Sequence, residues 1–290
     1  MTLDFTNALV SSYLRSDSQK KSMPFVFSDR RAALVVAHPG HELRVYDWLS
    51  RAHPSVFVLT DGSSHCRQPR LHRTTSILNS LGAQPASIYG RITDAEIYLA
   101  ILDRNCDLFV ETARELAEAL VRDQIEYVVG DAIEGYNPAH DVCRLIINAA
   151  VKRASQMGHR VENFDVLLAG NAANYPAETL TDAISIEVDD KMLSQKLQAA
   201  RDYSELAVDV HRILDEEGID SLRTECLRRV TEDSGDGHFK EPPYYEIYGE
   251  QQVAAGYYQQ VIRYREHVLP IARALRQYVA SRSRAANCGY

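Results

Sequence analysis

Short apolar segments alternate with helical segments over the first two thirds of the chain, and this alternation constrains the fold more than any other feature. The apolar segments end in turns or polar residues, and the segments between them repeat apolar residues at helical spacing. The predicted strands are 32–37, 55–60, 86–89, 126–129, 164–169 and 183–188, and the predicted helices between them are 43–51, 71–81, 109–123 and 141–154. The alternation predicts βαβ units and therefore an α/β fold, a Rossmann-like, mostly parallel sheet with helices on both faces.

The pattern changes near residue 190, where helical segments follow one another. These predicted helices cover 190–217, 221–230 and 251–281. We therefore predict three parts: an N-terminal helix and linker (1–30, with the helix at about 5–14), an α/β metal-binding domain (31–190) and a C-terminal helical extension packed on the same domain (191–290).

The composition excludes several classes of function. The net charge of −8 argues against a general nucleic-acid or anionic-membrane surface, because both attract a basic protein. No apolar run is long enough to span a bilayer, and residues 1–30 contain no apolar signal region. The five cysteines are scattered and form no C-x-x-C pair, which argues against disulfides and thiolate zinc sites. We expect a cytoplasmic protein with reduced thiols.

The first predicted strand ends in two histidines, His38 and His41, with Pro39 and Gly40 between them. A buried strand that delivers two imidazoles at its carboxyl end is a suitable place for a metal. The alternative is that Pro-Gly forms a turn and the histidines are ordinary polar loop residues.

Other polar residues follow later strands. Asp61 follows the strand at 55–60, whereas Asp131 and His140 follow the strand at 126–129. The carboxyl ends of parallel strands share one edge of the sheet, where ligands bind. We therefore expect these side chains to lie near His38 and His41, which favours the metal site over the loop.

Three motifs carry a resemblance to a known family. They are Ala37-His-Pro-Gly-His-Glu42, Leu59-Thr-Asp-Gly62 and Asn137-Pro-Ala-His140. Their order resembles the PIG-L/LmbE-like zinc-dependent N-deacetylases, which carry A-H-P-D-D-E, a T-D-G-like turn and H-P-D-H. The resemblance covers roughly residues 30–190. It implies that His38, His41 and His140 bind Zn²⁺ or another divalent transition metal, and three histidines with an open position are a recognised catalytic zinc geometry.

The chain departs from the family pattern at the residues that move protons. Gly40 replaces the aspartate that acts as general base, and Asn137 replaces a histidine that helps to stabilise the tetrahedral intermediate. Loss of a general base typically lowers the rate by a factor on the order of 10²–10⁴. Asn137 can still donate a hydrogen bond to an oxyanion. The carboxylates that could replace the base are Glu42, Asp61, Asp131, Glu134 and Asp141. We favour Asp61 and Asp131, which directly follow strands, because Glu42 and Asp141 suit the first turn of a helix.

Arg70, Tyr244 and Glu246 are predicted to bind substrate. The resemblance implies a substrate-contacting arginine at Arg70, and the alternative is a solvated surface arginine. Tyr244 belongs to a tyrosine-rich segment, 244–264, whose rings suit a sugar or an interface between copies of the chain, while packing is the ordinary role of such residues. Glu246 lies in the stretch that leads into the last predicted helix.

We therefore expect a metal-dependent hydrolase, an N-deacetylase or amidohydrolase that acts on an N-acyl amino sugar or a related small molecule with an altered general base. One alternative keeps the fold and the three-histidine site but catalyses a different reaction on a sugar or nucleotide-like substrate. Another is a non-catalytic binding or scaffold protein. The expected partners are a sugar-like small molecule and, through the tyrosines, a second copy of the chain, but no nucleic acid or membrane.

Overall fold

The computed structural model describes residue 27 and residues 29–63, 68–168, 183–203, 206, 214–215, 218–231 and 241–286. The predicted N-terminal helix at about 5–14 lies outside the described residues. The end of the strand predicted at 164–169 and the second half of the helix predicted at 190–217 also fall largely outside them.

A seven-stranded sheet forms the centre of the described structure, with the strand order β3-β2-β1-β4-β5-β7-β6. The strands are β1 Ala32–Val36, β2 Ser55–Thr60, β3 Gln84–Ile92, β4 Tyr127–Asp131, β5 Glu162–Val166, β6 Ile184–Glu187 and β7 Thr224–Arg229. The first five strands pair in parallel, and β7 runs antiparallel to both of its neighbours. The predicted α/β class and mostly parallel sheet are confirmed.

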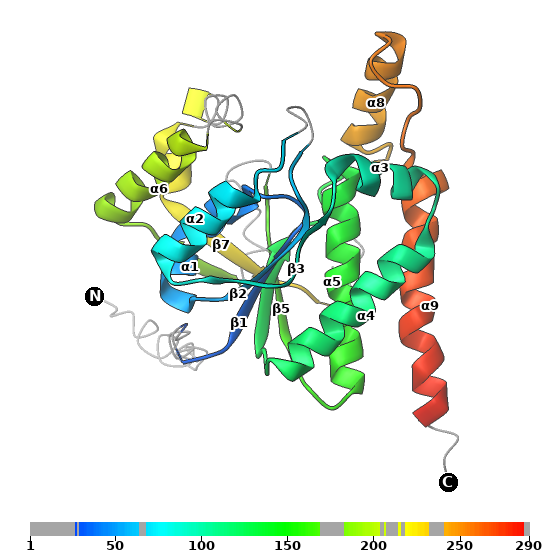
Figure 1. The fold of residues 1–290 in the computed structure, drawn as a ribbon, viewed down its shortest axis with the longest axis horizontal. Helices are drawn as coiled ribbons and strands as arrows, with labels where there is room; N and C mark the ends of the chain where they lie inside the picture. The colour runs from blue at the N-terminus through cyan, green and yellow to red at the C-terminus, as the bar shows by residue number, and fades with distance from the viewer. Residues whose placement is uncertain are drawn as a thin grey trace, which may run out of the picture.

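Helices cover both faces of this sheet. They are α1 Tyr46–Ala52, α2 Leu71–Leu81, α3 Asp94–Leu102, α4 Cys106–Arg122, α5 Pro138–Gln156, α6 Asp190–Asp202, α8 Tyr244–Ala254 and α9 Leu269–Ala286, with 3₁₀ turns at His41–Val45 and Ile219–Leu222 and a π-helical turn at Tyr264–Val268. Helices α1, α2 and α6 lie on one side of the sheet and α4, α5 and α9 on the other (Figure 1). No helix in the described ranges is long and apolar enough to cross a bilayer.

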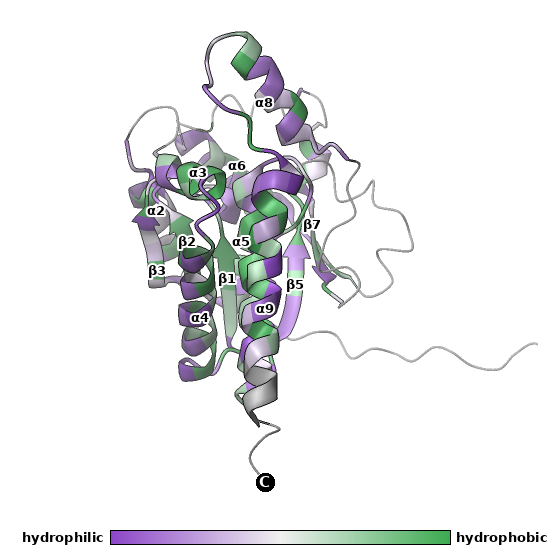
Figure 2. Cartoon of the chain, turned by 90° about the vertical axis from the view of Figure 1, so that its right-hand side faces the viewer, coloured by the Kyte–Doolittle hydropathy of each residue, from purple (hydrophilic) through white to green (hydrophobic). Residues whose placement is uncertain are grey.

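The central strand β1 is apolar throughout because both of its faces are buried. Successive side chains of a strand point to opposite faces. Ala33 and Val35 therefore join the core beneath α4, α5 and α9, whereas Leu34 and Val36 join the core beneath α1 and α2. Figure 2 shows β1 as a hydrophobic strand behind the α4 and α9 layer. A strand buried on both faces cannot alternate polar and apolar residues.

The C-terminal part differs from the prediction in two places. The helix predicted at 221–230 is wrong, because Thr224–Arg229 forms β7 and pairs with β5 and β6. The extension is thus not wholly helical and completes the sheet. The single helix predicted at 251–281 is also wrong, because α8 ends at Ala254 and α9 begins at Leu269. Helix α3 was not predicted.

Candidate functional site

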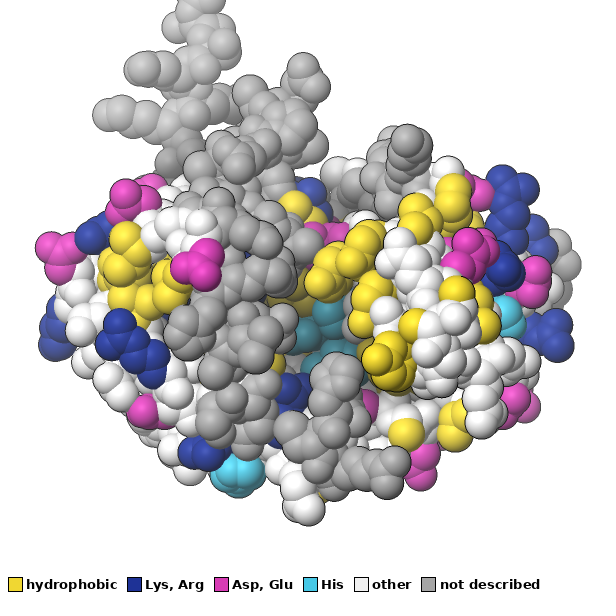
Figure 3. Space-filling model, turned by 90° about the horizontal axis from the view of Figure 1, so that it is seen from above, with side chains coloured by type: hydrophobic (Ala, Val, Ile, Leu, Met, Phe, Trp, Pro, Cys, Tyr) yellow, Lys and Arg dark blue, Asp and Glu magenta, His cyan; other side chains and the backbone are white. Residues whose placement is uncertain are grey.

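Three histidines meet at the carboxyl edge of the sheet. His38 follows β1, His41 begins the 3₁₀ turn after it, and His140 lies in the first turn of α5 after β4. The ring centroids lie 5.5 Å apart for His38 and His41, 5.2 Å for His38 and His140, and 4.5 Å for His41 and His140. Seen from above this edge, histidine side chains lie at the bottom of a hollow whose rim carries hydrophobic side chains (Figure 3). The structure therefore brings the three predicted metal ligands together.

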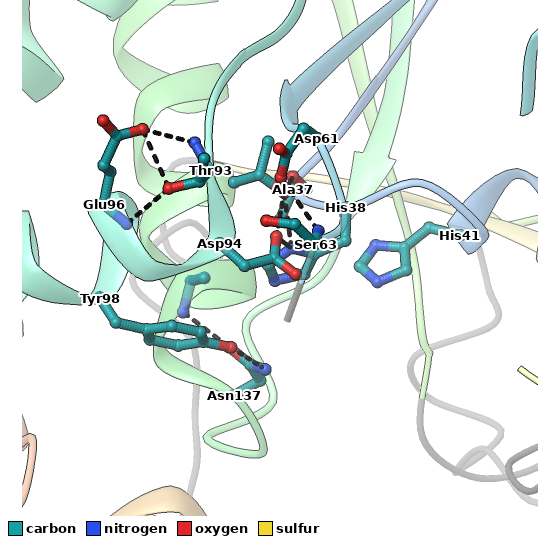
Figure 4. A network of polar contacts seen from close by, with 12 residues as sticks. Ala37, His38, His41, Asp61, Ser63, Thr93, Asp94, Glu96, Tyr98 and Asn137 are labelled. Carbon is teal, nitrogen blue, oxygen red and sulfur yellow. Dashed lines mark hydrogen bonds and ion pairs between the residues drawn. The ribbon is translucent and has the colours of Figure 1, made fainter. Parts of the chain in front are cut away.

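Two of these rings are oriented by carboxylates. His38 Nδ1 lies 2.8 Å from Asp94 Oδ1, and His41 Nδ1 lies 3.0 Å from both carboxylate oxygens of Asp131. Figure 4 shows Asp94 beside His38. Because a carboxylate oxygen only accepts, Nδ1 of each ring donates a hydrogen to it, which leaves Nε2 on the far side of the ring. Carboxylates commonly hold metal-binding histidines in this orientation.

Two ring nitrogens of the cluster make no hydrogen bond to the described protein. Among the described residues, His38 Nε2 and His140 Nδ1 are buried and have no hydrogen-bond partner. Burial lowers the pKa of His140 well below its ordinary value of 6.5, and the nearby His41 and His38 lower it further. His140 is therefore neutral at pH 7, as a metal ligand must be.

The side chains do not, as they stand, form a finished metal site. Within the described ranges, no group of three or more His, Cys, Asp or Glu side chains is arranged to hold a metal ion. The donor set nevertheless fits a transition metal, because three imidazoles share one space and two buried nitrogens there have no partner.

Gly40 cannot be replaced by a residue with a side chain without strain. Its φ of +108° lies in a region that L-residues rarely adopt, and a Cβ built on it would stand 2.4 Å from Leu206 Cδ1. The Leu206 side chain therefore occupies the space into which a side chain at position 40 would begin to extend.

The two favoured replacement bases occupy different environments. Asp131 accepts from the Ala37 amide and contacts His41 with both oxygens, so its carboxylate is fully used in holding the site. Asp61 is 8% exposed, and the only hydrogen bond of its side chain within the described residues comes from the Ser63 amide to Oδ1. Of the two, Asp61 keeps an oxygen for a proton.

The other three candidate carboxylates accept hydrogen bonds from backbone amides. Glu42 is fully buried and accepts from the Gly40 amide and the Thr74 hydroxyl, and burial raises its pKa. Asp141 accepts from the Glu134 and Gly135 amides, and burial raises its pKa to about 7. Glu134 itself accepts from the Leu168 amide.

Asn137 caps α5 and contacts a tyrosine that the sequence pattern did not single out. Its Oδ1 accepts from the Ala139 amide, and its Nδ2 donates to the Tyr98 hydroxyl at 2.9 Å. The Tyr98 ring stacks on His38 with 6.4 Å between centroids, and burial raises the Tyr98 pKa to about 12. Tyr98 therefore stays protonated at the edge of the histidine cluster (Figure 4).

Tyr98 and Asp94, both on α3, were missed because α3 was not recognised. A signal was present, since Thr93-Asp-Ala-Glu96 matches the capping box that starts many helices. The structure forms this box, with Thr93 Oγ1 accepting from the Glu96 amide and Glu96 accepting from the Thr93 amide. The cap fixes where α3 begins, and therefore where Asp94 reaches His38.

Arg70 is not a solvated surface residue. It is 8% exposed, and its Nε has no hydrogen-bond partner within the described chain. Its Nε lies 2.8 Å from the point where a Cβ on Gly62 would stand, so the glycine makes room for the guanidinium. Burial raises the pKa of Tyr98, and the positive charge of Arg70 lowers it slightly.

Tyr244 and Glu246 have separate surroundings. Tyr244 is 51% exposed and stacks on other tyrosines. The Glu246 carboxylate pairs with Arg263 and accepts from the Tyr264 amide, so it ties α8 to the segment before α9.

The chain resembles solved structures over part of its length. No protein-family model and no curated protein matches the chain. A deacetylase triple mutant of the teicoplanin biosynthetic pathway is 18% identical, with a TM-score of 0.46 over 70% of this chain and 100% of that chain. The zinc-inhibited form of teicoplanin deacetylase Orf2 is 16% identical, with a TM-score of 0.45, and the match again covers 70% of this chain and 100% of that chain.

Proposed function

We propose that the chain is a zinc-dependent hydrolase that removes an acyl group from the nitrogen of an amino sugar or a related small molecule. The main support is the convergence of His38, His41 and His140 at the carboxyl edge of the sheet, with ring centroids 4.5–5.5 Å apart and two unpartnered buried nitrogens.

His38, His41 and His140 would hold the metal. Zinc in a three-histidine site lowers the pKa of a coordinated water to about 7 and polarises a carbonyl group. Asp94 and Asp131 keep the Nδ1 protons of His38 and His41 in place, which leaves Nε2 of each ring as the donor atom. The neutral His140 supplies the third nitrogen.

The remaining residues have roles toward the substrate. The Tyr98 hydroxyl accepts from Asn137, so its own hydrogen is available to an oxyanion that develops on the amide carbonyl. Asp61 would take the proton that the attacking water loses, since both Asp131 oxygens are engaged. The buried Arg70 would bind a carboxylate, phosphate or hydroxyl group of the substrate, because a buried guanidinium gains most from such a partner.

The test is metal content together with amine release. Purified protein dialysed against zinc should retain about one zinc per chain, measured by mass spectrometry of the metal, and His140→Ala should retain little. His72→Ala, at an exposed position on α2, is the matched control. Release of glucosamine from N-acetylglucosamine should follow the zinc content. Negligible zinc in the wild type, unchanged by His140→Ala, would rule out the proposal.

One observation favours a second candidate, a binding protein without hydrolytic activity. Gly40 has no side chain to take a proton, and Leu206 Cδ1 lies 2.4 Å from the point where a Cβ at position 40 would stand. Such a protein would hold zinc but release no amine from any acylated amino sugar. Zinc retention with no amine release, and with no effect of Asp61→Asn on binding, would select this candidate.

A further inference from the structure

A buried arginine on α5, Arg144, reaches two neighbouring strands of the sheet. It is 1% exposed. Its Nε donates to the backbone carbonyl of Asp131 on β4, its Nη2 donates to the carbonyl of Phe164 on β5 at 3.0 Å, and its Nη1 donates to the side-chain oxygen of Asn163 at 2.8 Å. Gly130 leaves room for it, because a Cβ on that glycine would stand 3.1 Å from Arg144 Nη2. One guanidinium therefore connects α5 to both β4 and β5.

Packing alone does not call for a charge at this position. An apolar side chain of similar volume would fill the space without the cost of taking a guanidinium out of water. The three hydrogen bonds of Arg144 go to neutral oxygens. Burial lowers the pKa of Arg144, and nearby anionic groups, with Asp165 first among them, raise it, so the guanidinium stays protonated. What Arg144 adds to the fold is the set of hydrogen bonds that it donates.

These hydrogen bonds connect two sides of the histidine cluster. His140 precedes Arg144 by four residues, so the two side chains lie on the same face of α5. The carbonyl that accepts from Arg144 Nε belongs to Asp131, and the carboxylate of the same residue holds His41 Nδ1. A continuous path therefore leads from His140 along α5 to Arg144, and from there through Asp131 to His41. The rings at its two ends lie 4.5 Å apart.

We propose that Arg144 is a positioning residue that fixes the His41 ring relative to the His140 ring. The inference rests on the proposed function only in treating these rings as metal ligands. His38 provides an internal comparison, because Asp94 on α3 holds its Nδ1, and the printed hydrogen bonds of Arg144 all go to β4 and β5. Loss of Arg144 should therefore loosen His41 and leave His38 in place.

The two histidines can be compared in one sample of the metal-free full chain. NMR of protein labelled with ¹⁵N in its histidine rings measures how fast each Nδ1 hydrogen exchanges with water, and His41→Ala assigns the signal. In Arg144→Met the His41 hydrogen should exchange about tenfold faster, the effect of one lost hydrogen bond from a charged donor. The His38 hydrogen should exchange as in the wild type. Arg144→Lys keeps the charge but not the planar fork, so it should give an intermediate rate at His41.

Zinc affinity is the second readout. Arg144→Met should bind zinc about 10- to 100-fold more weakly in competition with a coloured chelator, as is typical when a residue that orients a metal ligand is lost. The matched control is Ile146→Ala, which removes core packing from the same helix at a residue that is 1% exposed. It should keep the zinc affinity of the wild type. Urea denaturation of both variants shows that each is folded under the conditions of the measurement.

The outcomes separate this inference from the proposed function. Faster exchange confined to His41 supports the role of Arg144 even if the wild type takes up no zinc, in which case only the proposed function fails. Equal acceleration at His38 and His41 would mean that the whole domain has loosened, and it overturns the inference. Wild-type exchange at His41 in Arg144→Met overturns it too. In a wild type that binds zinc, so does an unchanged zinc affinity of Arg144→Met.

Discussion

At the scale of single residues, the site depends on pairs in which one side chain fixes another. Asp94 fixes His38, and Asp131 fixes His41 while also accepting from the Ala37 amide. The His41 imidazole needs its own acceptor for an Nδ1 hydrogen. Asp131 supplies that acceptor, so its place at the end of β4 is better explained by positioning than by proton transfer.

Replacing this carboxylate should weaken zinc binding. Asp131→Asn keeps the shape but removes the charge that holds the His41 Nδ1 proton, and loss of such a partner typically lowers metal affinity 10- to 100-fold. Competition with a coloured chelator measures the change, with the exposed Asp103→Asn as control. Zinc affinity equal to that of the wild type would show that Asp131 does not orient His41.

Introducing a carboxylate at position 40 should lower stability without raising activity. Gly40→Asp places a side chain at a φ of +108° and against Leu206, and such strain costs on the order of 1–3 kcal/mol of unfolding free energy. Urea denaturation should show this loss, and amine release should not rise. The double variant Gly40→Ala, Leu206→Ala removes the contact with the Leu206 side chain but keeps the backbone strain at position 40. It should therefore recover only part of the stability that Gly40→Asp loses. A faster Gly40→Asp enzyme would contradict the assigned role of Leu206.

Asp141 should make stability depend on pH. Its pKa is raised from 3.8 to about 7. Between pH 4 and pH 7 the carboxyl group is therefore protonated in the folded metal-free protein but ionised in the unfolded chain. The stability that this carboxyl contributes is complete below about pH 4 and is lost as the pH rises toward 7, by at most about 4 kcal/mol. Asp141→Asn keeps the acceptor for the Glu134 and Gly135 amides and should gain stability relative to the wild type over this range. Urea denaturation from pH 4 to 8 measures the difference, and a difference that does not vary with pH would contradict it.

At the scale of elements, the sequence predicted those strands and helices whose own residues show a clear pattern. The apolar runs of β1 and β4 placed His38, His41 and His140 at one edge of the sheet because strand ends are local features, although α5 begins at Pro138, three residues before the predicted start at 141. Strand β7 was mistaken for a helix because its residues Thr-Glu-Cys-Leu-Arg-Arg carry no alternation, and pairing with β5 and β6 decides its conformation. The break between α8 and α9 had a signal in Gly256, which adopts a φ of +80° just after the last turn of α8.

A buried carboxylate on β7 connects this strand to the start of α1, which follows the turn that carries His41. Glu225 accepts from the Asp47 and Trp48 amides at the start of α1 and pairs with Lys196 at 2.9 Å. Helix α1 directly follows the 3₁₀ turn that begins with His41. Glu225 thus holds one end of that turn in place.

Removing Glu225 should destabilise the whole domain. Glu225→Ala leaves Lys196 buried without its partner and two amides without an acceptor, which typically costs about 3–5 kcal/mol. Urea denaturation measures the loss, and Glu187→Ala, exposed on the neighbouring strand β6, should have little effect. A loss below about 1 kcal/mol for Glu225→Ala would show that neither the ion pair with Lys196 nor the hydrogen bonds from the two α1 amides matter for folding.

At the scale of the whole molecule, the parallel sheet gathers side chains from distant parts of the chain at one edge. His38 and His140 are about a hundred residues apart in sequence, yet their rings lie 5.2 Å apart because β1 and β4 are neighbours. This convergence could be predicted from the order of strands and helices. Asp131, which orients His41, could be placed in the same way, whereas Asp94 and Tyr98 reach His38 through tertiary contacts of α3, a helix that was not recognised.

The central claim is that His38, His41 and His140 bind one zinc ion. Zinc-edge X-ray absorption of the zinc-treated protein tests it most directly, because scattering from imidazole rings is distinct from that of thiolates or carboxylates. The account predicts three imidazole nitrogens at about 2.0–2.1 Å and one further oxygen, with one imidazole fewer in His41→Ala. A spectrum without imidazole scattering, or one that His41→Ala leaves unchanged, would contradict it.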